Sequence, residues 1–237
     1  GVARSWAPIY PVHGYKLNGD PVLDDKGNHI YDAGTGQTEG TSARPVATNQ
    51  NVACSMREDI RRSVYNSLNG KGYVEATFLK HFTFNANVSY EYNGGEGTIF
   101  YTPTIGDGQS FNGRGTQNTY TGTTLNTVQL LSYSNIFGDN HNFSAKIGHE
   151  YYIFKDNYLE GQKTKFFDPF NPALVNGGEI QYVDSAPSEH AIEGLFAMAD
   201  YSYASRYYLS AAFRRDGSTR FSPERMWGNF WSVGAGW

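Results

Sequence analysis

The chain has 237 residues and a formal net charge of −4, and this slightly acidic balance excludes nucleic acid as an expected partner, because nucleic-acid binding needs a basic surface. Hydrophobic residues make up only 39% of the chain and charged residues 18%, whereas Tyr, Phe and Gly number 18, 15 and 27. This composition excludes a helical bundle and predicts an all-β protein whose strands carry two very different faces.

The N-terminal part of the chain, residues 1–56, is rich in Pro, Gly and Asp. Its short apolar stretches, residues 21–23 and 29–31, predict a small hairpin within a long loop and no independent domain. Several acidic and amide residues resemble a scattered calcium loop, but they lack the spacing and the terminal Glu that such a loop needs. These residues are expected to form turns instead: Asp20, Asp24, Asp25, Asn28 and Asp32.

The clearest periodic segment is residues 82–92, in which apolar and polar residues alternate without interruption. This period of two predicts a β-strand, and its length matches the roughly 9–11 residues that a tilted strand needs to cross a bilayer. One face of the strand is expected to lie on the lipid-facing side of a single curved antiparallel sheet. The residues expected to face lipid are Phe82, Phe84, Val88 and Tyr90. Residues 73–79 are expected to pair with this strand through a tight turn, with a possible extension through residues 64–69.

The same alternation recurs in the rest of the chain. Further strands are expected at residues 125–133, 142–154, 195–203, 207–214 and 229–237. Turns inside the resulting pairs are short, whereas the links between pairs are long. These links are residues 93–118, 155–190 and 216–228. Short periplasmic turns that alternate with long extracellular loops are typical of outer-membrane barrels, so the pattern predicts about seven strands of a larger transmembrane barrel.

A soluble, secreted β-sandwich that binds carbohydrate is the alternative interpretation. A sandwich would bury its apolar face against a second sheet about 10 Å away, whereas a barrel turns that face outward to lipid. Polar faces rich in Asn, Ser, Thr and Gly, together with loops of unequal length, favour the barrel.

Two stretches near the C-terminus carry a family resemblance. YYLSAAFRRDGSTRF at residues 207–221 and WGNFWSVGAGW at residues 227–237 resemble the barrel motif of SusC/RagA-like TonB-dependent transporters. Shorter matches occur elsewhere in the chain. They are APIYP at residues 7–11, FLK with FTF at residues 78–84, and GHEYY at residues 148–152.

The resemblance implies a barrel of about 22 strands that encloses a plug domain and sits in the outer membrane of a Gram-negative bacterium. It implies import of a glycan or a peptide together with a SusD-like surface lipoprotein, powered through TonB. Residues 1–237 would then be a partial barrel domain, with residues 1–63 mostly an extracellular loop and residues 64–237 the hairpin strands. The plug is absent from this sequence, so TonB contact is expected only through an N-terminal part that is missing here.

Aromatic and basic residues of the first long link are the expected contacts for substrate or for the lipoprotein lid, since Tyr and Arg often anchor such surfaces. They are Phe100, Tyr101, Phe111 and Arg114. Trp231 and Trp237 suit an interfacial aromatic girdle, whereas Trp227 fits a girdle and loop packing equally well. A charged group after residue 213 is expected to form surface ion pairs in preference to a ligand site. It comprises Arg214, Arg215, Asp216, Arg220 and Glu224.

No enzyme is predicted. The histidines are scattered without ligand spacing, and His149 and Glu150 would point to opposite faces of a strand, which spoils them as an acid–base pair. No nucleophile elbow, phosphate-binding loop or zinc-protease motif is present, so neither a cofactor nor a metal is expected. The single cysteine, Cys54, excludes an internal disulfide and a cysteine-based metal site.

Overall fold

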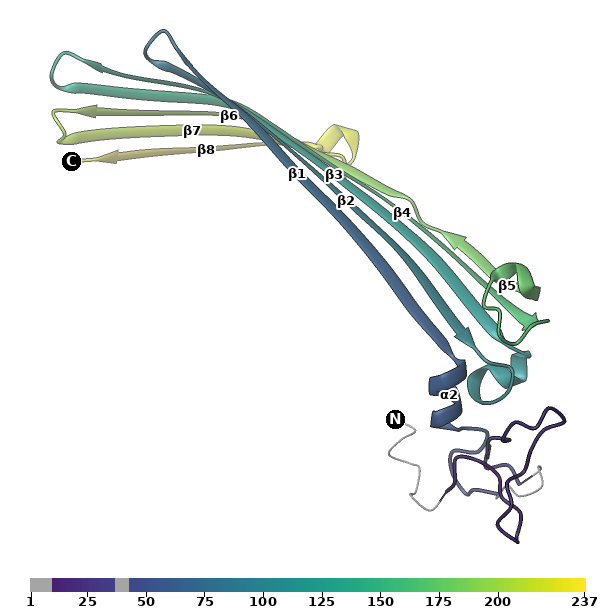
Figure 1. Cartoon of the computed structure of the whole chain (residues 1–237). Coiled ribbons are helices and arrows are strands. Elements are labelled where there is room, and N and C mark those ends of the chain that lie inside the picture. Colours follow the sequence, from purple (N-terminus) through teal and green to yellow (C-terminus); the bar gives the residue numbers. More distant parts are fainter. Residues whose placement is uncertain (1–9, 37–42) are drawn as a thin grey trace. The chain divides into compact units, whose positions relative to one another are not determined.

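The computed structural model describes residues 10–36 and 43–237, which contain one eight-stranded sheet in the order β1-β2-β3-β4-β6-β7-β8, with β5 paired to β4 (Figure 1). The strands are β1 (Ile60–Phe78), β2 (Phe82–Tyr101), β3 (Arg114–Phe137), β4 (His141–Phe166), β5 (Gly177–Ser185), β6 (Ser188–Tyr203), β7 (Tyr207–Ser218) and β8 (Trp227–Gly236). This architecture confirms the all-β antiparallel fold class.

The helices of the described ranges are short. One α-helix, α2 (Val52–Glu58), precedes β1, and the 3-10 helices lie at Gly106–Phe111, Leu174–Asn176 and Pro223–Arg225. None of these helices is long and apolar enough to cross a membrane.

The chain forms two compact units, and the longer strands contribute residues to both. The first unit comprises the described residues of Gly1–Val64, together with Gly95–Thr119 and Leu159–Ser185. The second unit comprises Tyr65–Gly94, Tyr120–Tyr158 and Ala186–Trp237. The β4–β5 pairing belongs to the first unit, whereas the β4–β6, β6–β7 and β7–β8 pairings belong to the second.

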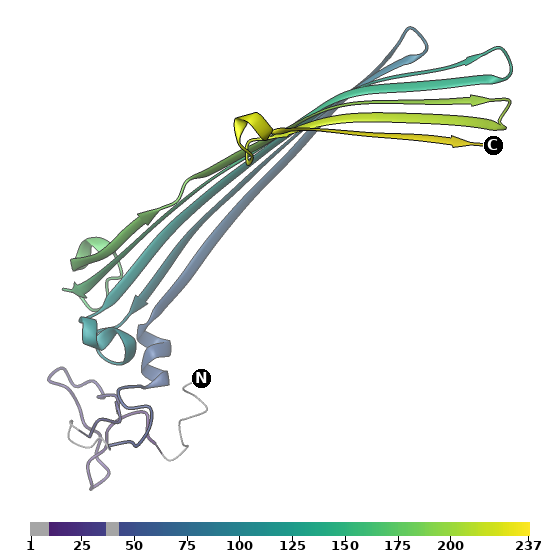
Figure 2. The ribbon, with the colours of Figure 1, turned by 180° about the vertical axis from the view of Figure 1, so that it is seen from behind.

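Tight turns join the two strands within each hairpin of the second unit. Leu79 and Lys80 between β1 and β2 have φ values of 49° and 62°, and Ala204 and Ser205 between β6 and β7 both have 51°. Positive φ at both central residues is the geometry of a type I′ turn, which matches the right-handed twist of the flanking strands. Figures 1 and 2 show these turns and the β3–β4 turn at one end of the sheet, where the C-terminus also lies.

The strands are longer than the sequence pattern predicts. β2 continues through residues 93–101 and β3 already begins at Arg114, so the predicted link at residues 93–118 is reduced to residues 102–113. Gly94, Gly95 and Gly97 interrupt the apolar alternation and favour a loop in sequence terms. Backbone pairing with neighbouring strands outweighs this weak local preference.

β5 is an additional strand inside the predicted link at residues 155–190. β5 pairs with Leu159–Phe166 of β4, and the preceding part of β4 pairs with β6. Only Ala186 and Pro187 separate β5 from β6. Proline has no N–H to donate to a sheet, so Pro187 explains why one long strand is divided here.

The first unit has a small apolar core next to the β2–β3 connection. Phe100, Ile105 and Phe166 are 0%, 2% and 3% exposed, and the rings of Phe100 and Phe166 meet edge to face at 4.9 Å between centroids. Thr102 follows Phe100 closely and is also buried. Edge-to-face contact adds to the stabilisation from burial of the two rings.

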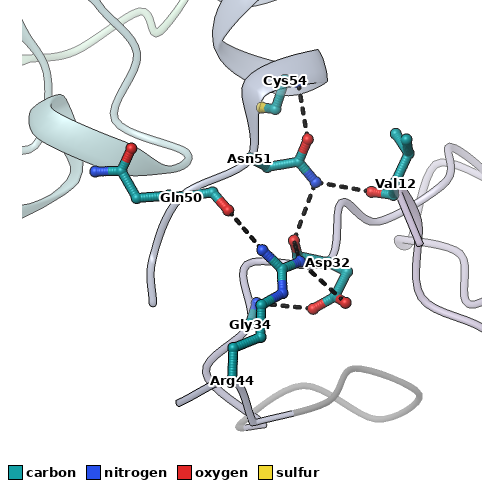
Figure 3. A network of polar contacts seen from close by, with 7 residues as sticks. All are labelled: Val12, Asp32, Gly34, Arg44, Gln50, Asn51 and Cys54. Atoms are coloured by element: carbon teal, nitrogen blue, oxygen red, sulfur yellow. Dashed lines mark hydrogen bonds and ion pairs between the residues drawn. The ribbon is translucent and has the colours of Figure 1, made fainter. Parts of the chain in front are cut away.

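A buried polar network organises the described N-terminal residues (Figure 3). Arg44 and Asp32 form an ion pair of 3.1 Å in which both side chains are fully buried. Asn51 donates hydrogen bonds to the carbonyl oxygens of Val12 and Asp32 at 2.8 and 3.0 Å, and its own side-chain oxygen accepts the N–H of Cys54 at 3.1 Å. Asn51 is therefore both the N-cap of α2 and the link between that helix and the preceding loop.

The predicted N-terminal hairpin is present as isolated bridges. Leu23 pairs with His29 as expected, whereas Pro21 pairs with Tyr15. Asp24 accepts hydrogen bonds from the backbone N–H groups of Lys26 and Asn28, which is the predicted turn-forming role. Residues 7–9 of the APIYP match lie outside the described residues.

Candidate functional site

The second unit carries a broad apolar face. Partnered residues in an antiparallel sheet share a face, and Ile147, Ala197, Phe213 and Trp231 are successive partners across β4, β6, β7 and β8. Two further apolar rows extend this face toward the tight turns. They are Ala145, Ala199, Ala211 and Val233, and Phe143, Tyr201, Leu209 and Ala235. Ile147, Trp231 and Val233 are 57%, 78% and 66% exposed, so these rows form a contiguous exposed apolar surface.

The opposite face of the same strands is more polar toward the tight turns, and farther from them it also carries Phe196 and Phe230. The row between the first two apolar rows contains Lys146, Met198, Ala212 and Ser232. The next rows toward the turns contain Ser144, Asp200, Ser210 and Gly234, and Asn142, Ser202, Tyr208 and Gly236. A shallow hollow on the sheet is lined mainly by residues of these last two rows. Near the tight turns, the sheet therefore separates an apolar surface from a more hydrophilic one.

The apolar residues of β2 join the apolar face. Phe82 contacts Tyr133 at 4.9 Å between ring centroids, and Tyr133 contacts Phe143 at 6.1 Å. Phe84 lines an apolar depression together with Ile147 and Phe213 of that face. Val88 and Tyr90 are 46% and 44% exposed, and the strands of the described ranges form no second sheet that could cover them. This is the arrangement that the orientation prediction requires, and contact with lipid stays a prediction.

Aromatic rings gather beside the tight turns. Tyr203 stacks with Tyr207 at 6.4 Å and meets His141 at 4.8 Å, and Phe78 stacks with Phe82 at 5.6 Å. The predicted girdle residues Trp231 and Trp237 are 78% and 94% exposed. Trp231 lies in the apolar row of Phe213, whereas Trp237 follows the end of β8.

A charged cluster lies on the polar face of the sheet, on the side of the described rows that is farther from the tight turns. The Nε of Arg214 donates to both carboxylate oxygens of Asp216 at 2.7 and 2.9 Å, and its Nη2 donates to Glu150 at 2.9 Å. The guanidinium also lies over the ring of Phe196, 5.6 Å from its centroid. The predicted pairing of Arg214 with Asp216 is confirmed, while Glu150 comes from a distant strand and was not part of the predicted group.

The other basic residues of that predicted group have different contacts. Arg215 lies over the ring of Trp227 at 5.0 Å, and Arg220 contacts the ring nitrogens of His190 at 3.3 and 3.4 Å. Arg214 and Arg215 diverge because successive residues of a strand point to opposite faces. For the same reason His149 and Glu150 are separated, as predicted, with Leu195 and Gly194 as their respective partners.

Gly148 makes room for the aromatic support of Arg214. Gly148 is the cross-strand partner of Phe196, and a Cβ at this position would lie 2.2 Å from the Phe196 ring. We expect Gly148→Ala to lower the free energy of unfolding by roughly 1–3 kcal/mol, because the ring must leave its place beneath the guanidinium. Denaturant titration of the complete protein measures this change. Gly70→Ala is the matched control, since nothing lies within 4 Å of a Cβ there and its cost should be small.

The first unit brings the predicted contact residues Tyr101, Phe111 and Arg114 together with Arg61. The Cζ of Arg114 lies 4.7 Å from the centroid of the Tyr101 ring and 5.2 Å from that of Phe111. Arg61 lies 5.4 Å from the Tyr101 ring and donates a hydrogen bond of 3.2 Å to its hydroxyl. Two guanidinium groups beside the half-buried Tyr101 and the exposed Phe111 form a surface suited to carboxylates and to flat polar groups.

Phe100 differs from the other predicted contacts. Its side chain is fully buried against Phe166, so its role here is in the core and not on a contact surface. Its sequence position in an aromatic stretch gave no sign of this, because the covering residue belongs to β4. Contact with substrate or lid by Tyr101, Phe111 and Arg114 remains a prediction.

The connection at residues 102–113 is fastened to the end of α2. The backbone N–H of Thr102 donates to Asp59 at 3.0 Å, and the Thr102 hydroxyl donates to Glu58 at 2.9 Å. Burial raises the pKa of Asp59 even though the Thr102 hydrogen bond opposes this shift. These bonds hold the root of the connection that carries Phe111.

His149 and Cys54 both have structural surroundings that explain them without a catalytic role. The ring nitrogens of His149 each lie 2.9 Å from a side-chain oxygen, one of Gln129 and one of Glu193. Burial raises the pKa of the Cys54 thiol to about 12, which keeps it protonated and unreactive at neutral pH. Within residues 10–36 and 43–237, no group of three or more His, Cys, Asp or Glu side chains is placed to hold a metal ion.

Comparisons with known proteins connect these features to a family. No family model matches the chain. The chain is 26% identical over 170 residues to the TonB-dependent receptor P39 of Formosa agariphila. The aligned region covers 70% of this chain and 16% of that protein. It is 25% identical over 186 residues to the TonB-dependent receptor SusC of Bacteroides thetaiotaomicron, and this aligned region covers 76% of the present chain and 18% of SusC. The chain thus spans less than a fifth of the length of these curated relatives.

Solved structures support the same fold. The RagAB peptide transporter matches with a TM-score of 0.74 at 18% identity, covering 94% of this chain and 24% of that chain. The RagAB peptide importer in its closed-closed state matches with a TM-score of 0.72 at 19% identity, covering 92% and 23%. The fold is that of a RagAB segment, and the similarity to SusC and P39 confirms the resemblance that the C-terminal motif predicted.

Proposed function

Because the chain is similar to segments of SusC/RagA-like TonB-dependent receptors, we propose that it forms part of the wall of an outer-membrane transporter that imports a nutrient. The observation that carries this proposal is the exposed apolar face of β4, β6, β7 and β8 opposite a face that is more polar toward the tight turns. In a membrane barrel, outward residues meet hydrocarbon and inward residues meet a hydrated lumen, while the strands pair every backbone group. The two faces of this sheet have that division.

The tight turns face the periplasm in this proposal, and the longer connections face the cell exterior. The short connections are residues 79–81, 138–140 and 204–206, and the longer ones are residues 102–113, 167–176 and 219–226. The two kinds alternate along the chain, apart from the brief break between β5 and β6. Aromatic rings beside the tight turns support a position of these turns at a membrane interface, since Tyr and Trp favour such interfaces.

The complete transporter would take up a glycan or a peptide with the help of a SusD-like surface lipoprotein. RagAB, the solved structure with a similar fold, is described as a peptide transporter, which supports a peptide as one of these two substrates. Energy would come through TonB, which would contact a part of the transporter outside the present chain. The cluster of Arg61, Tyr101, Phe111 and Arg114 would contact the substrate or the lipoprotein.

The contact proposal can be tested at Arg114. In the complete transporter, Arg114→Ala should lower the apparent affinity for substrate or lipoprotein by roughly tenfold, because Arg anchors at such surfaces contribute about 1–2 kcal/mol or more. Growth on the imported nutrient and recovery of the lipoprotein with the tagged transporter are the measurements. A point substitution is preferable to deletion of residues 102–113, since that segment also contains the buried Ile105.

Arg62→Ala is the matched control for this test. Arg62 follows Arg61 in β1, is exposed, and makes no aromatic contact among the described residues. Its removal changes the net charge equally and should leave uptake and lipoprotein recovery unchanged. Equal results for the Arg114 and Arg62 variants would contradict the proposed contact role.

A soluble carbohydrate-binding sandwich is the weaker interpretation. A sandwich needs a second sheet to cover its apolar face, and the described strands all belong to one sheet. If the protein were soluble, these exposed apolar rows would face water without a second sheet to cover them.

A further inference from the structure

The consecutive residues Arg214 and Arg215 differ in what neutralises them. Arg214, on the polar face, is paired with two carboxylates, those of Asp216 and Glu150. Arg215 is the partner of Leu195 in β6 and of Asn229 in β8, so it points to the apolar face. Its guanidinium lies over the ring of Trp227, and no carboxylate pairs with it in the described part of the chain. A permanent positive charge is therefore left uncompensated beside the apolar rows.

Arg215 lies where the apolar face ends, at the margin away from the tight turns. Beyond the row of Ile147 and Phe213, the next rows on this face carry mainly polar and aromatic residues, with Leu195 as their one aliphatic side chain. They are His149, Leu195, Arg215 and Asn229, and then Tyr151, Glu193, Gly217 and Trp227. Glu193 is held by His149 at 2.9 Å and does not pair with Arg215. In a membrane wall this margin lies at the level of the lipid headgroups.

The position of the Trp227 ring beneath Arg215 depends on a glycine in the neighbouring strand. Gly217 is the cross-strand partner of Trp227, and a Cβ on Gly217 would lie 2.9 Å from the Trp227 ring. The absence of that Cβ lets the indole lie across the backbone of β7, where Arg215 can cover it. The indole thereby holds the guanidinium at the margin while leaving its N–H donors free to point outward.

We propose that Arg215, held on Trp227, binds the phosphate group of a membrane-lipid headgroup. A guanidinium presents paired N–H donors that match two phosphate oxygens, and such charge-assisted bonds strengthen where water is scarce. The indole ring fits the boundary between headgroups and hydrocarbon. This inference rests on the proposed function, because it needs the apolar face to lie in a bilayer.

The test uses the complete transporter, purified in neutral detergent and titrated with phosphatidic acid or with diacylglycerol of the same acyl chains. Native mass spectrometry measures the bound lipid. The unaltered protein should prefer phosphatidic acid by at least about tenfold, and Arg215→Ala should abolish this preference. Arg215→Lys should retain part of it, because a lysine keeps the charge but loses the paired donors. Arg220→Ala, which removes an exposed arginine of the next connection, should retain all of it.

Each other result has a defined meaning. An unchanged preference in an Arg215→Ala protein that still inserts into the outer membrane would overturn the lipid site alone. Loss of the preference in 10 mM inorganic phosphate, chosen as roughly physiological, would show a general anion site and would overturn it too. Recovery of the unaltered transporter in the soluble fraction would overturn the proposed function together with this inference.

Discussion

Ala211→Lys should lower the free energy of unfolding of the membrane-inserted transporter by about 2–4 kcal/mol. Ala211 lies in the middle of the three apolar rows, with Ala199 and Val233 as its partners. In the proposed wall this row is in hydrocarbon, where an ammonium group cannot keep its hydration. Denaturant titration in lipid vesicles measures the loss, and a reduced fraction of heat-modifiable protein on gels should accompany it.

Ala212→Lys is the control, and its cost should be close to zero. Ala212 is the next residue of the same strand, but it lies on the polar face with Met198 and Ser232 as its partners. Both substitutions replace the same residue type and add the same charge, so strand propensity cancels in the comparison. Ala211→Leu should also be tolerated, since it adds apolar surface on the apolar face. Equal costs for the two lysine variants would mean that both faces meet water, which is incompatible with a membrane wall.

Much of the sheet could be predicted from the sequence because a membrane wall imposes a simple rule on it. Where one face meets an apolar medium and the other meets water, residues must alternate, and residues 82–92 do so. The predicted seven strands correspond to the seven that form the continuous path from β1 to β8. The motif at residues 207–237 added the family resemblance that the comparisons confirm.

The ends of the strands could not be predicted in the same way. Residues 93–101 and 177–185 are strands whose glycines and polar residues resemble a loop, and only pairing with distant segments makes them regular. Intrinsic strand preference is weak, so neighbouring strands decide. The statement that residues 1–63 are mostly an extracellular loop concerns the placement of the chain in a membrane and stays a prediction.

The candidate sites were predictable only where the relevant residues are close in sequence. Arg214 and Asp216 are two positions apart in one strand, which puts them on one face. Glu150 and Phe196 complete that cluster from other strands, and the register of those strands is not visible in a single sequence. Phe100 shows the same limit, because only the position of Phe166 reveals that it is buried.

The 237-residue chain produced alone should neither close into a barrel nor conduct solutes. In the described sheet β1 pairs only with β2, and β8 pairs only with β7. The antiparallel path from β1 to β8 has an odd number of strands, so β1 and β8 run in the same direction and cannot complete an antiparallel barrel. An open edge in hydrocarbon leaves a row of unpaired N–H and C=O groups, each costing several kcal/mol. The edges should therefore drive aggregation or pairing between copies.

Refolding of the isolated chain into detergent and into liposomes tests this expectation. A gel-mobility comparison with and without boiling detects a closed barrel, since barrels resist unfolding by detergent at room temperature and migrate as compact species. A liposome-swelling assay detects a pore that admits small sugars. The complete transporter, refolded in parallel, is the positive control for membrane insertion. A compact, heat-modifiable monomer of the isolated chain that admits sugars would show that β1 and β8 can close on each other, and the segment would then be a pore in its own right.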